Sequence, residues 1–146
     1  RPFVGPAGQL LDQHLATAGI DRSEAYVTNA VKHFKFQWSG KRRLHQNPTA
    51  GEIDHCRWWL DAERELVSPT HVLVLGASAL RGVIGRGVSI NQARQQPVQL
   101  AEGVHMHVSV HPSYLLRLND DAIRAQEERR FQQDLQRLGA SLALVN

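Results

Sequence analysis

Apolar residues recur at helical spacing along much of the chain and mark its expected helices. Residues 7–19 place leucines on one face and stop at Gly19. A second helix is expected to open at Thr49, where Glu52 three residues later would complete a capping box. Further helices are expected at residues 77–84 and from Asn119 and Asp120 to about Leu138.

Short apolar runs predict buried strands at residues 25–31, 71–76 and 104–110. Strands that alternate with helices are typical of βαβ units, so we expect an α/β fold: a three-layer α/β/α arrangement around a central, mostly parallel sheet. In such sheets ligands bind beyond the carboxyl ends of the strands. We therefore expect the segment after Asn29 and the segment from His111 to Arg117 to face one crevice.

A length of 146 residues suits a single domain with its own core. Apolar residues make up 42% and charged residues 21% of the chain, as in ordinary globular proteins. No apolar run approaches the ~20 residues that a membrane span needs, and one cysteine cannot form an internal disulfide. The chain opens on "RPFVGPAGQ" rather than on methionine, so we expect residues 1–146 to be one domain whose N-terminal part, including the first strand, is absent.

The net charge is +3, and five of the 17 lysine and arginine residues fall within residues 32–45. Residues 32–45 contain no acid and interleave lysine and arginine with Phe34, Phe36 and Trp38. Cations mixed with aromatic residues suit a surface that follows a nucleic-acid backbone and stacks on bases. The alternative is a solvated basic loop whose aromatic residues fold into the core.

Several residues beside the expected strand ends carry suitable chemistry, and each also has a purely structural alternative. Asn29 can read the edge of a base or cap a turn. Phe3 can stack on a planar ligand or fill the core. His111 precedes a proline, which holds its backbone extended, and it can donate to a developing anion or simply end the strand. Leu115 and Leu116, beside Arg117, can form an apolar wedge into a base stack, or one leucine can plug the sheet edge.

Five blocks of sequence, in order, resemble the family 4 uracil-DNA glycosylases over residues 1 to about 117. The blocks are "RPFVGPAGQLL", "YVTNAVK", "EIDHCRWWL", "VLVLGASA" and "HPSYLLR". The combination of "VKHFKF" with "KRRLHQNP" is similar to the UdgX branch of that superfamily. The family's Gly- and acid-rich first motif, which supplies contacts to uracil and an acidic catalytic residue, is expected upstream of Arg1.

This resemblance implies roles for individual residues. Phe3 would stack on the flipped uracil, Asn29 would hydrogen-bond its Watson–Crick edge, and His111 would stabilise the negative charge on the departing base. The Leu115–Leu116 region, with Arg117, would contact the DNA where the base leaves. The resemblance also implies a 4Fe-4S cluster, for which His33 and Cys56 would supply two ligands and two cysteines upstream of residue 1 the others.

The UdgX branch implies a further role for His45, which would attack C1′ of the sugar and join the protein covalently to DNA. Lys41, Arg42 and Arg43 would hold the flanking phosphates, and their charge would disfavour protonation of His45. The implied partner is uracil-containing, single-stranded DNA, bound by a monomer in the bacterial cytoplasm and nucleoid, with no role for a membrane. The alternatives are an ordinary turnover glycosylase, in which His45 only contacts phosphate, and a DNA-binding module without catalysis.

Overall fold

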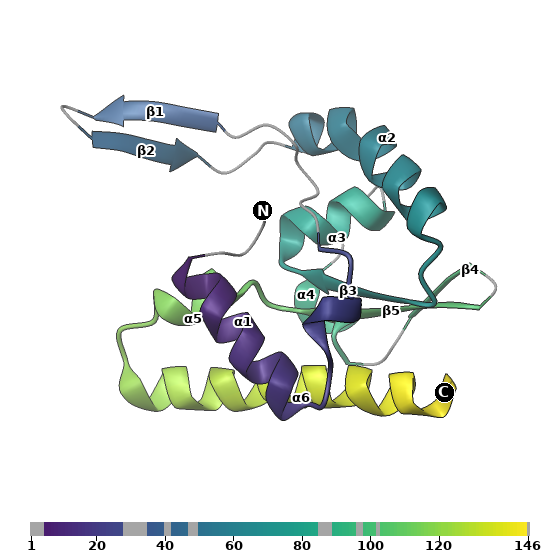
Figure 1. The fold of residues 1–146 in the computed structure, drawn as a ribbon. Coiled ribbons are helices and arrows are strands. Elements are labelled where there is room, and N and C mark those ends of the chain that lie inside the picture. Colours follow the sequence, from purple (N-terminus) through teal and green to yellow (C-terminus); the bar gives the residue numbers. More distant parts are fainter. Residues whose placement is uncertain are drawn as a thin grey trace.

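The computed structural model describes residues 5–27, 35–39, 42–46, 50–84, 89–95, 98–101 and 103–145 (Figure 1), with the backbone alone at 35–39, 42–46, 55–60, 63, 64, 101 and 145. The elements are α1 (Pro6–Thr17), η1 (Arg22–Glu24), β1 (Lys35–Ser39), β2 (Arg42–Gln46), α2 (Ala50–Val67), β3 (His71–Leu75), α3 (Ala77–Ile84), α4 (Ile90–Ala93), β4 (Val98–Ala101), β5 (Val104–Ser109), α5 (Pro112–Leu116) and α6 (Asp121–Val145).

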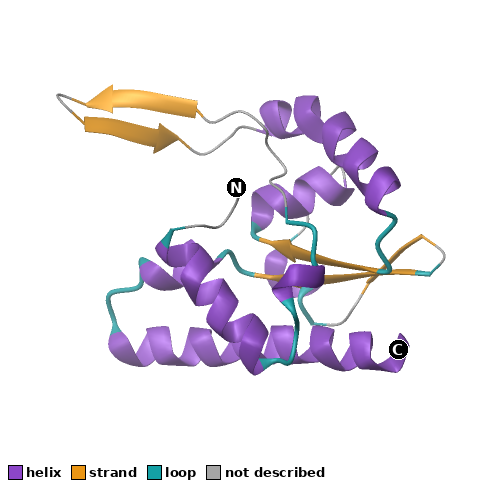
Figure 2. Cartoon of the chain, viewed as in Figure 1, coloured by secondary structure: helices purple, strands orange, loops and turns teal. Residues whose placement is uncertain are grey.

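The central sheet has three strands in the order β3–β5–β4 (Figure 2). β3 runs parallel to β5, in a register that pairs Leu75 with Ser109 and so brings the two strand ends together. β4 is antiparallel to β5 and reaches it through a tight turn at Gly103, where φ is +79°. The sheet is therefore mixed, and the expected α/β fold is confirmed.

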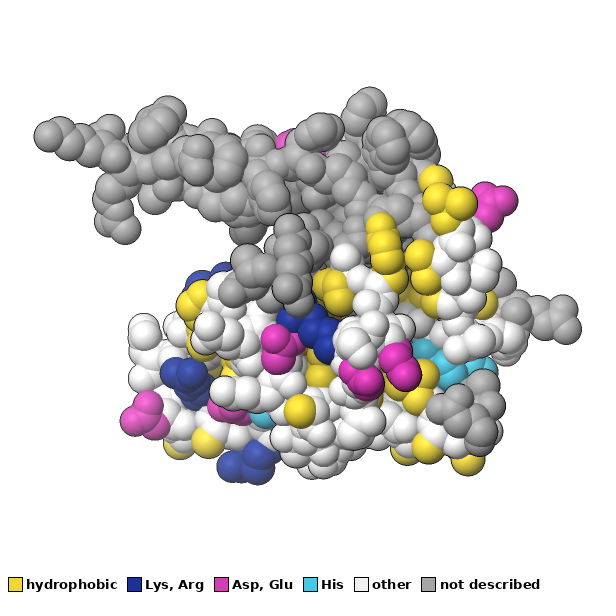
Figure 3. Space-filling view, in the orientation of Figure 1, with side chains coloured by type: hydrophobic (Ala, Val, Ile, Leu, Met, Phe, Trp, Pro, Cys, Tyr) yellow, Lys and Arg dark blue, Asp and Glu magenta, His cyan; other side chains and the backbone are white. Residues whose placement is uncertain are grey.

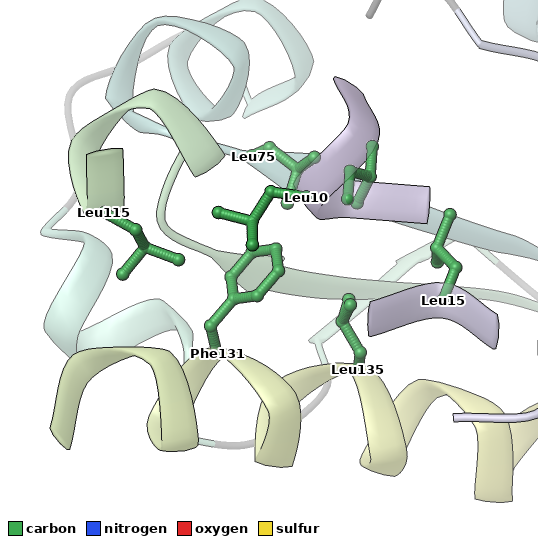
Figure 4. Close-up of a cluster of buried hydrophobic side chains, with 7 residues drawn as sticks. Leu10, Leu15, Leu75, Leu115, Phe131 and Leu135 are labelled. Carbon is green, nitrogen blue, oxygen red and sulfur yellow. The ribbon is translucent and has the colours of Figure 1, made fainter. Parts of the chain in front are cut away.

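Helices cover both faces of this sheet (Figure 1). On one face, α1, α5 and α6 pack against β3, and Phe131 of α6 points toward Leu10 and Leu75 (Figure 4). On the other face, α3 and α4 bury residues of β3 and β5, including Val74 and Met106. Alternate residues of β3 thus enter different cores, as the two-residue period of a strand requires.

The long helix α6 begins with a side-chain cap. Asp120 accepts a hydrogen bond at Oδ1 from the backbone N–H of Ile123 at 3.0 Å, which satisfies one donor of the first turn. The expected helix start at Asn119 and Asp120 is confirmed, but the helix continues beyond Leu138 to Val145. Within the described ranges, no helix is long and apolar enough to cross a membrane.

Two parts of the sequence-based prediction are wrong where the structure describes them. Residues 25–27 of the expected strand 25–31 have no regular secondary structure, and Tyr26 is 60% exposed; residues 28–31 lie outside the described residues. The expected basic loop instead contains an antiparallel hairpin, β1–β2. β4 was not predicted.

Candidate active site

His111 lies two residues beyond the carboxyl end of β5 and caps the first turn of α5. Its backbone is extended, with φ −68° and ψ 137°, and Pro112 follows at the first helical position. The extended backbone expected from the following proline is confirmed.

Ser113 determines which ring nitrogen of His111 carries the proton. The backbone N–H of Ser113 donates to Nδ1 of His111 at 3.1 Å, and Oγ of Ser113 lies 2.7 Å from the same atom. A backbone N–H can only donate, so Nδ1 is an acceptor and the neutral ring carries its proton at Nε2. Burial, and then the charge of Arg117, lower the pKa of His111, so near pH 7 the ring is neutral and acts as an N–H donor at Nε2.

Gly76 brings the end of β3 against His111. Its φ is +91°, and a Cβ at this position would lie 3.2 Å from Cβ of His111. The backbone N–H of Gly76 also donates to the carbonyl of Ser109 at 2.9 Å. The strand ends carrying Gly76 and His111 therefore meet at one edge of the sheet, as the parallel arrangement predicts.

A buried ionic cluster lies behind this edge. Asp134 of α6 is 4% exposed and Arg94, just after α4, is 5% exposed. Oδ2 of Asp134 accepts from Nε of Arg94 at 3.0 Å, from its Nη2 at 2.5 Å, and from Oγ of Ser109 at 2.6 Å. Nη2 of Arg137 donates to Oδ1 of Asp134 and, at 3.0 Å, to the carbonyl of Arg94.

Sequence reasoning missed this cluster, although the chain carries a signal for it. Asp134 lies among Phe131, Leu135 and Leu138, at helical spacing on the apolar face of α6. An acid on such a face requires a buried partner. The partner Arg94 is 40 residues away in the sequence, and the apolar pattern gives no indication of it.

α5 separates the two leucines that were expected to act together. Leu115 is 0% exposed and belongs to the core with Phe131 (Figure 4), so we correct the prediction that it contacts DNA. Leu116 and Tyr114 are each 37% exposed. Arg117 is exposed, and its Nη1 donates to Oγ of Ser113 at 3.3 Å. Leu116, Tyr114 and Arg117 therefore form the exposed surface next to His111.

The basic segment contains the β1–β2 hairpin, which projects away from the central sheet (Figure 1). Its register pairs Phe36 with His45 and Trp38 with Arg43. Arg42, Arg43 and His45 therefore lie on a strand and not in a loop, with their backbone alone described; Lys41 is outside the described residues.

The expected uracil-binding and cluster-binding side chains are not among those that the structure describes. Phe3, Asn29 and His33 lie outside the described residues, and Cys56 is on α2 with only its backbone described. No group of three or more potential metal ligands occurs among the residues that were described. His33 and Cys56 are two donors, and a 4Fe-4S cluster takes four protein ligands, so these two residues alone do not form a site for it.

One cavity in the described part of the chain, of about 590 Å³, lies at the other end of the strands. It is lined by Asp61, Glu65, Ser68, Pro69, Thr70, Gly103 and Val104. Thr70 precedes β3 and Val104 begins β5, whereas His111 follows the end of β5. This cavity is therefore separate from the edge that carries His111.

Comparison of the sequence with known proteins assigns the chain to a family. The model of the "Uracil DNA glycosylase superfamily" matches residues 1–136. A type-4 uracil-DNA glycosylase of Thermotoga maritima is 36% identical over 85% of this chain and 62% of its own length. One of Pyrobaculum aerophilum is 30% identical over 92% of this chain and 66% of its own. The chain thus spans just under two thirds of the length of these two relatives. It belongs to the uracil-DNA glycosylase superfamily, with a family 4-like sequence.

Proposed function

We propose that the protein is a uracil-DNA glycosylase, which removes uracil by breaking the bond between uracil N1 and C1′ of the deoxyribose. The observation that carries this proposal is the state of His111. Its Nδ1 accepts from Ser113 and burial lowers its pKa, so a neutral ring presents an N–H donor at Nε2. The superfamily match over residues 1–136 supports the same assignment.

The chemistry of base excision requires such a donor. When the C1′–N1 bond breaks, its electron pair leaves with uracil and the sugar gains oxocarbenium character, as in glycoside hydrolysis. A hydrogen bond from Nε2–H of His111 would stabilise the charge that develops on the base. Removing one preorganised donor of this kind lowers kcat by roughly 10²- to 10³-fold.

Recognition of uracil is assigned to Phe3 and Asn29. Enzymes of this type extrude the base from the stack before reaction. Phe3 would stack on its face, and the amide of Asn29 would hydrogen-bond its Watson–Crick edge. Asn29→Ala is expected to remove selectivity for uracil and most activity, because a pocket that loses its polar contact loses its means of discrimination.

DNA binding is assigned to the hairpin and to the surface around α5. Lys41, Arg42 and Arg43 would contact phosphates, and Leu116 with Arg117 would contact the strand at the excised base. Among described residues on the face drawn in Figure 3, lysine and arginine occur as separate groups between acidic and apolar ones, and form no continuous basic face. The hairpin sequence is therefore the main support for DNA binding.

We expect a monomer that binds uracil-containing single-stranded DNA and acts in the cytoplasm and nucleoid.

The finer proposal is covalent capture by His45. After uracil leaves, the lone pair of a neutral imidazole nitrogen of His45 would form a bond to C1′, and the other nitrogen would release its proton. The product would be protein joined to the sugar. The motivation is the "KRRLHQNP" segment, similar to that of the UdgX branch.

A 4Fe-4S cluster is the second finer proposal. His33 and Cys56 would supply two ligands, with two cysteines expected from upstream sequence. The test is the cluster absorbance and iron content of the full-length protein. His33→Ala and Cys56→Ala should each reduce both, while unchanged values would show that these residues are not ligands.

The activity is tested by incubating full-length protein with single-stranded DNA that contains one uracil, and measuring free uracil. Wild type should release uracil, and His111→Ala should do so about 10²- to 10³-fold more slowly. His71→Ala, at the other end of the sheet, is the matched control and should keep the wild-type rate. DNA binding without uracil release by wild type would instead indicate a non-catalytic DNA-binding protein.

The same samples test capture, when they are analysed by denaturing gel electrophoresis. Wild type should form an SDS-resistant adduct, and His45→Ser should lose the adduct while still releasing uracil, because water can take the vacated place. An adduct that survives in His45→Ser would identify another nucleophile. Uracil release by wild type without any adduct would indicate an ordinary turnover glycosylase.

A further inference from the structure

The Arg94–Asp134 ion pair is nearly excluded from solvent and connects three separate elements. Asp134 comes from α6, Arg94 follows α4, and Ser109 ends β5. Asp134 is 4% exposed, and within the described part of the chain its hydrogen-bond partners are guanidinium and hydroxyl donors. Ser109 is itself 0% exposed, so its hydrogen bond to Asp134 at 2.6 Å is shielded from water.

Stability alone is a weak explanation for such a cluster. Taking two charges out of water is expensive, and well-packed apolar residues of similar volume often serve a core equally well or better. The charged hydrogen bonds add a defined geometry, because each bond fixes an atom of one element relative to an atom of another. Here the fixed atom on the sheet is Oγ of Ser109, two residues before His111.

A short series of contacts connects Ser109 to His111. The carbonyl of Ser109 accepts from the backbone N–H of Gly76 at 2.9 Å. The missing side chain of Gly76 leaves room for His111, whose Cβ lies 3.2 Å from where a Cβ of Gly76 would be. A displacement of the end of β5 would therefore move the partner against which His111 packs, as well as the backbone that carries it.

We propose that Asp134 is a positioning residue, which holds the carboxyl end of β5 through Ser109 and so fixes the ring of His111 in its donating geometry. This role rests on the proposed function of His111. Supporting groups of this kind matter because a catalytic donor must be held close to its productive position by packing and hydrogen bonds around it. Asp134 itself does not touch the reacting atoms.

Two serine-to-alanine variants separate positioning from general stability. Asp134→Asn would leave Arg94 buried without its counter-charge and risks unfolding, whereas Ser109→Ala cuts the connection to β5 and keeps the ion pairs. The matched control is Ser141→Ala. Ser141 is also on α6 and lies 2.8 Å, Oγ to Nε2, from His71 at the start of β3, so this variant deletes the same group at the far end of the sheet.

Ser109→Ala and Ser141→Ala should lower the midpoint of urea unfolding of the full-length protein to a similar extent. Only Ser109→Ala should change the reactivity and titration of His111. Its kcat for uracil release should fall roughly 10- to 100-fold with little change in KM, the range seen when outer partners of metal ligands are removed. Its ring, less well buried, should titrate at higher pH. This shift is measured by NMR of the ring nitrogens, with the His111→Gln spectrum identifying the signals.

The NMR readout keeps the inference separate from the proposed activity. If wild type releases no uracil, a shifted His111 titration in Ser109→Ala alone still supports positioning, and only the glycosylase assignment fails. If Ser109→Ala and Ser141→Ala leave the His111 titration and tautomer equally unchanged, the cluster only stabilises the fold and the inference is overturned.

Discussion

Gly76, directly after β3, occupies a position where a residue with a side chain would be strained. Its φ of +91° is costly for any residue with a side chain, and its neighbour across the gap is Cβ of His111 at 3.2 Å. Gly103 has a similar φ of +79°, but nothing lies within 4 Å of where its Cβ would be. The two glycines share the conformational requirement, and Gly76 alone of the two has the contact with His111.

Gly76→Ala and Gly103→Ala should therefore have one effect in common and one that differs. Each places an L side chain in the left-handed region and should lower the free energy of unfolding by about 1–2 kcal/mol. Only Gly76→Ala should also slow uracil release, because the added methyl group pushes against His111. Urea unfolding and a uracil-release assay on both variants provide the comparison. Equal rates of uracil release in the two variants would show that Gly76 is needed only for its backbone conformation and not for its contact with His111.

Within α5, adjacent residues belong to different environments. Leu115 is 0% exposed and packs in the core with α1 and α6, whereas Leu116 is 37% exposed. A helix turns by about 100° per residue, so neighbouring side chains on a short helix at the surface cannot both face inward. Of the two alternatives that the sequence offered, burial of a single leucine therefore fits α5, and Leu115 is the buried one.

This division predicts opposite outcomes for two leucine-to-alanine substitutions. Leu115→Ala should lower the free energy of unfolding by about 2–5 kcal/mol, because it leaves a cavity in the core. Leu116→Ala should change it by no more than about 0.5 kcal/mol, as an exposed position, yet weaken binding to uracil-containing DNA. Urea unfolding measures the first effect, and gel-shift titration the second. Unchanged DNA affinity in Leu116→Ala would remove this residue from the proposed interface.

Some elements could be predicted from the sequence because their signal is local. β3, α3 and β5 lie where continuous apolar runs and helical spacing place them, within a residue or so at each end. The run at 25–31 has the same apolar character, but Tyr26 is exposed and residues 25–27 form no strand. Apolar composition indicates burial, and it does not reveal whether a partner strand lies alongside.

The missed elements depend on pairing between segments. β4 has exposed residues at Val98 and Gln99, so its pattern resembles a loop, and it becomes a strand through its antiparallel pairing with β5. The hairpin β1–β2 forms within a segment whose charge suggested a loop. At the site, His111 could be predicted from its place after a strand, whereas Gly76 falls within the predicted strand 71–76. The cluster around Asp134 could not, because its partners meet only in the folded chain.

At the scale of the whole molecule, three histidines lie on the sheet face that α6 covers. The ring centroid of His71 lies 5.3 Å from that of His105 and 6.1 Å from that of His107. Burial, followed by the charges of His71, His105 and Arg137, lowers the pKa of His107 to about 4. Its Nε2 is buried and has no hydrogen-bond partner within the described part of the chain.

His107 should therefore make the fold sensitive to acid. In the unfolded chain its pKa is about 6.5, so between pH 6.5 and about 4 the unfolded state binds a proton that the folded state does not. The stabilising contribution is complete above pH 6.5 and is lost as the pH falls toward 4. The melting temperature should drop between pH 7 and pH 5, and His107→Leu should make that drop smaller. An identical drop in both proteins would assign the acid sensitivity to other groups.

Because His111 caps α5 as well as being the proposed donor, its position has to meet one requirement for folding and another for activity. Its Nδ1 accepts from the backbone N–H of Ser113 and so completes the first turn of α5, while its other nitrogen is the proposed donor. In a library of all substitutions sorted for folding, Asn, Asp, Ser and Thr should survive, because their side-chain oxygens can cap a helix. Sorting for uracil release should retain histidine. His111→Asn should keep weak activity, because its amide both accepts and donates hydrogen bonds. A survey that recorded only which residues occur at this position would therefore not separate the proposed catalytic constraint from the structural one.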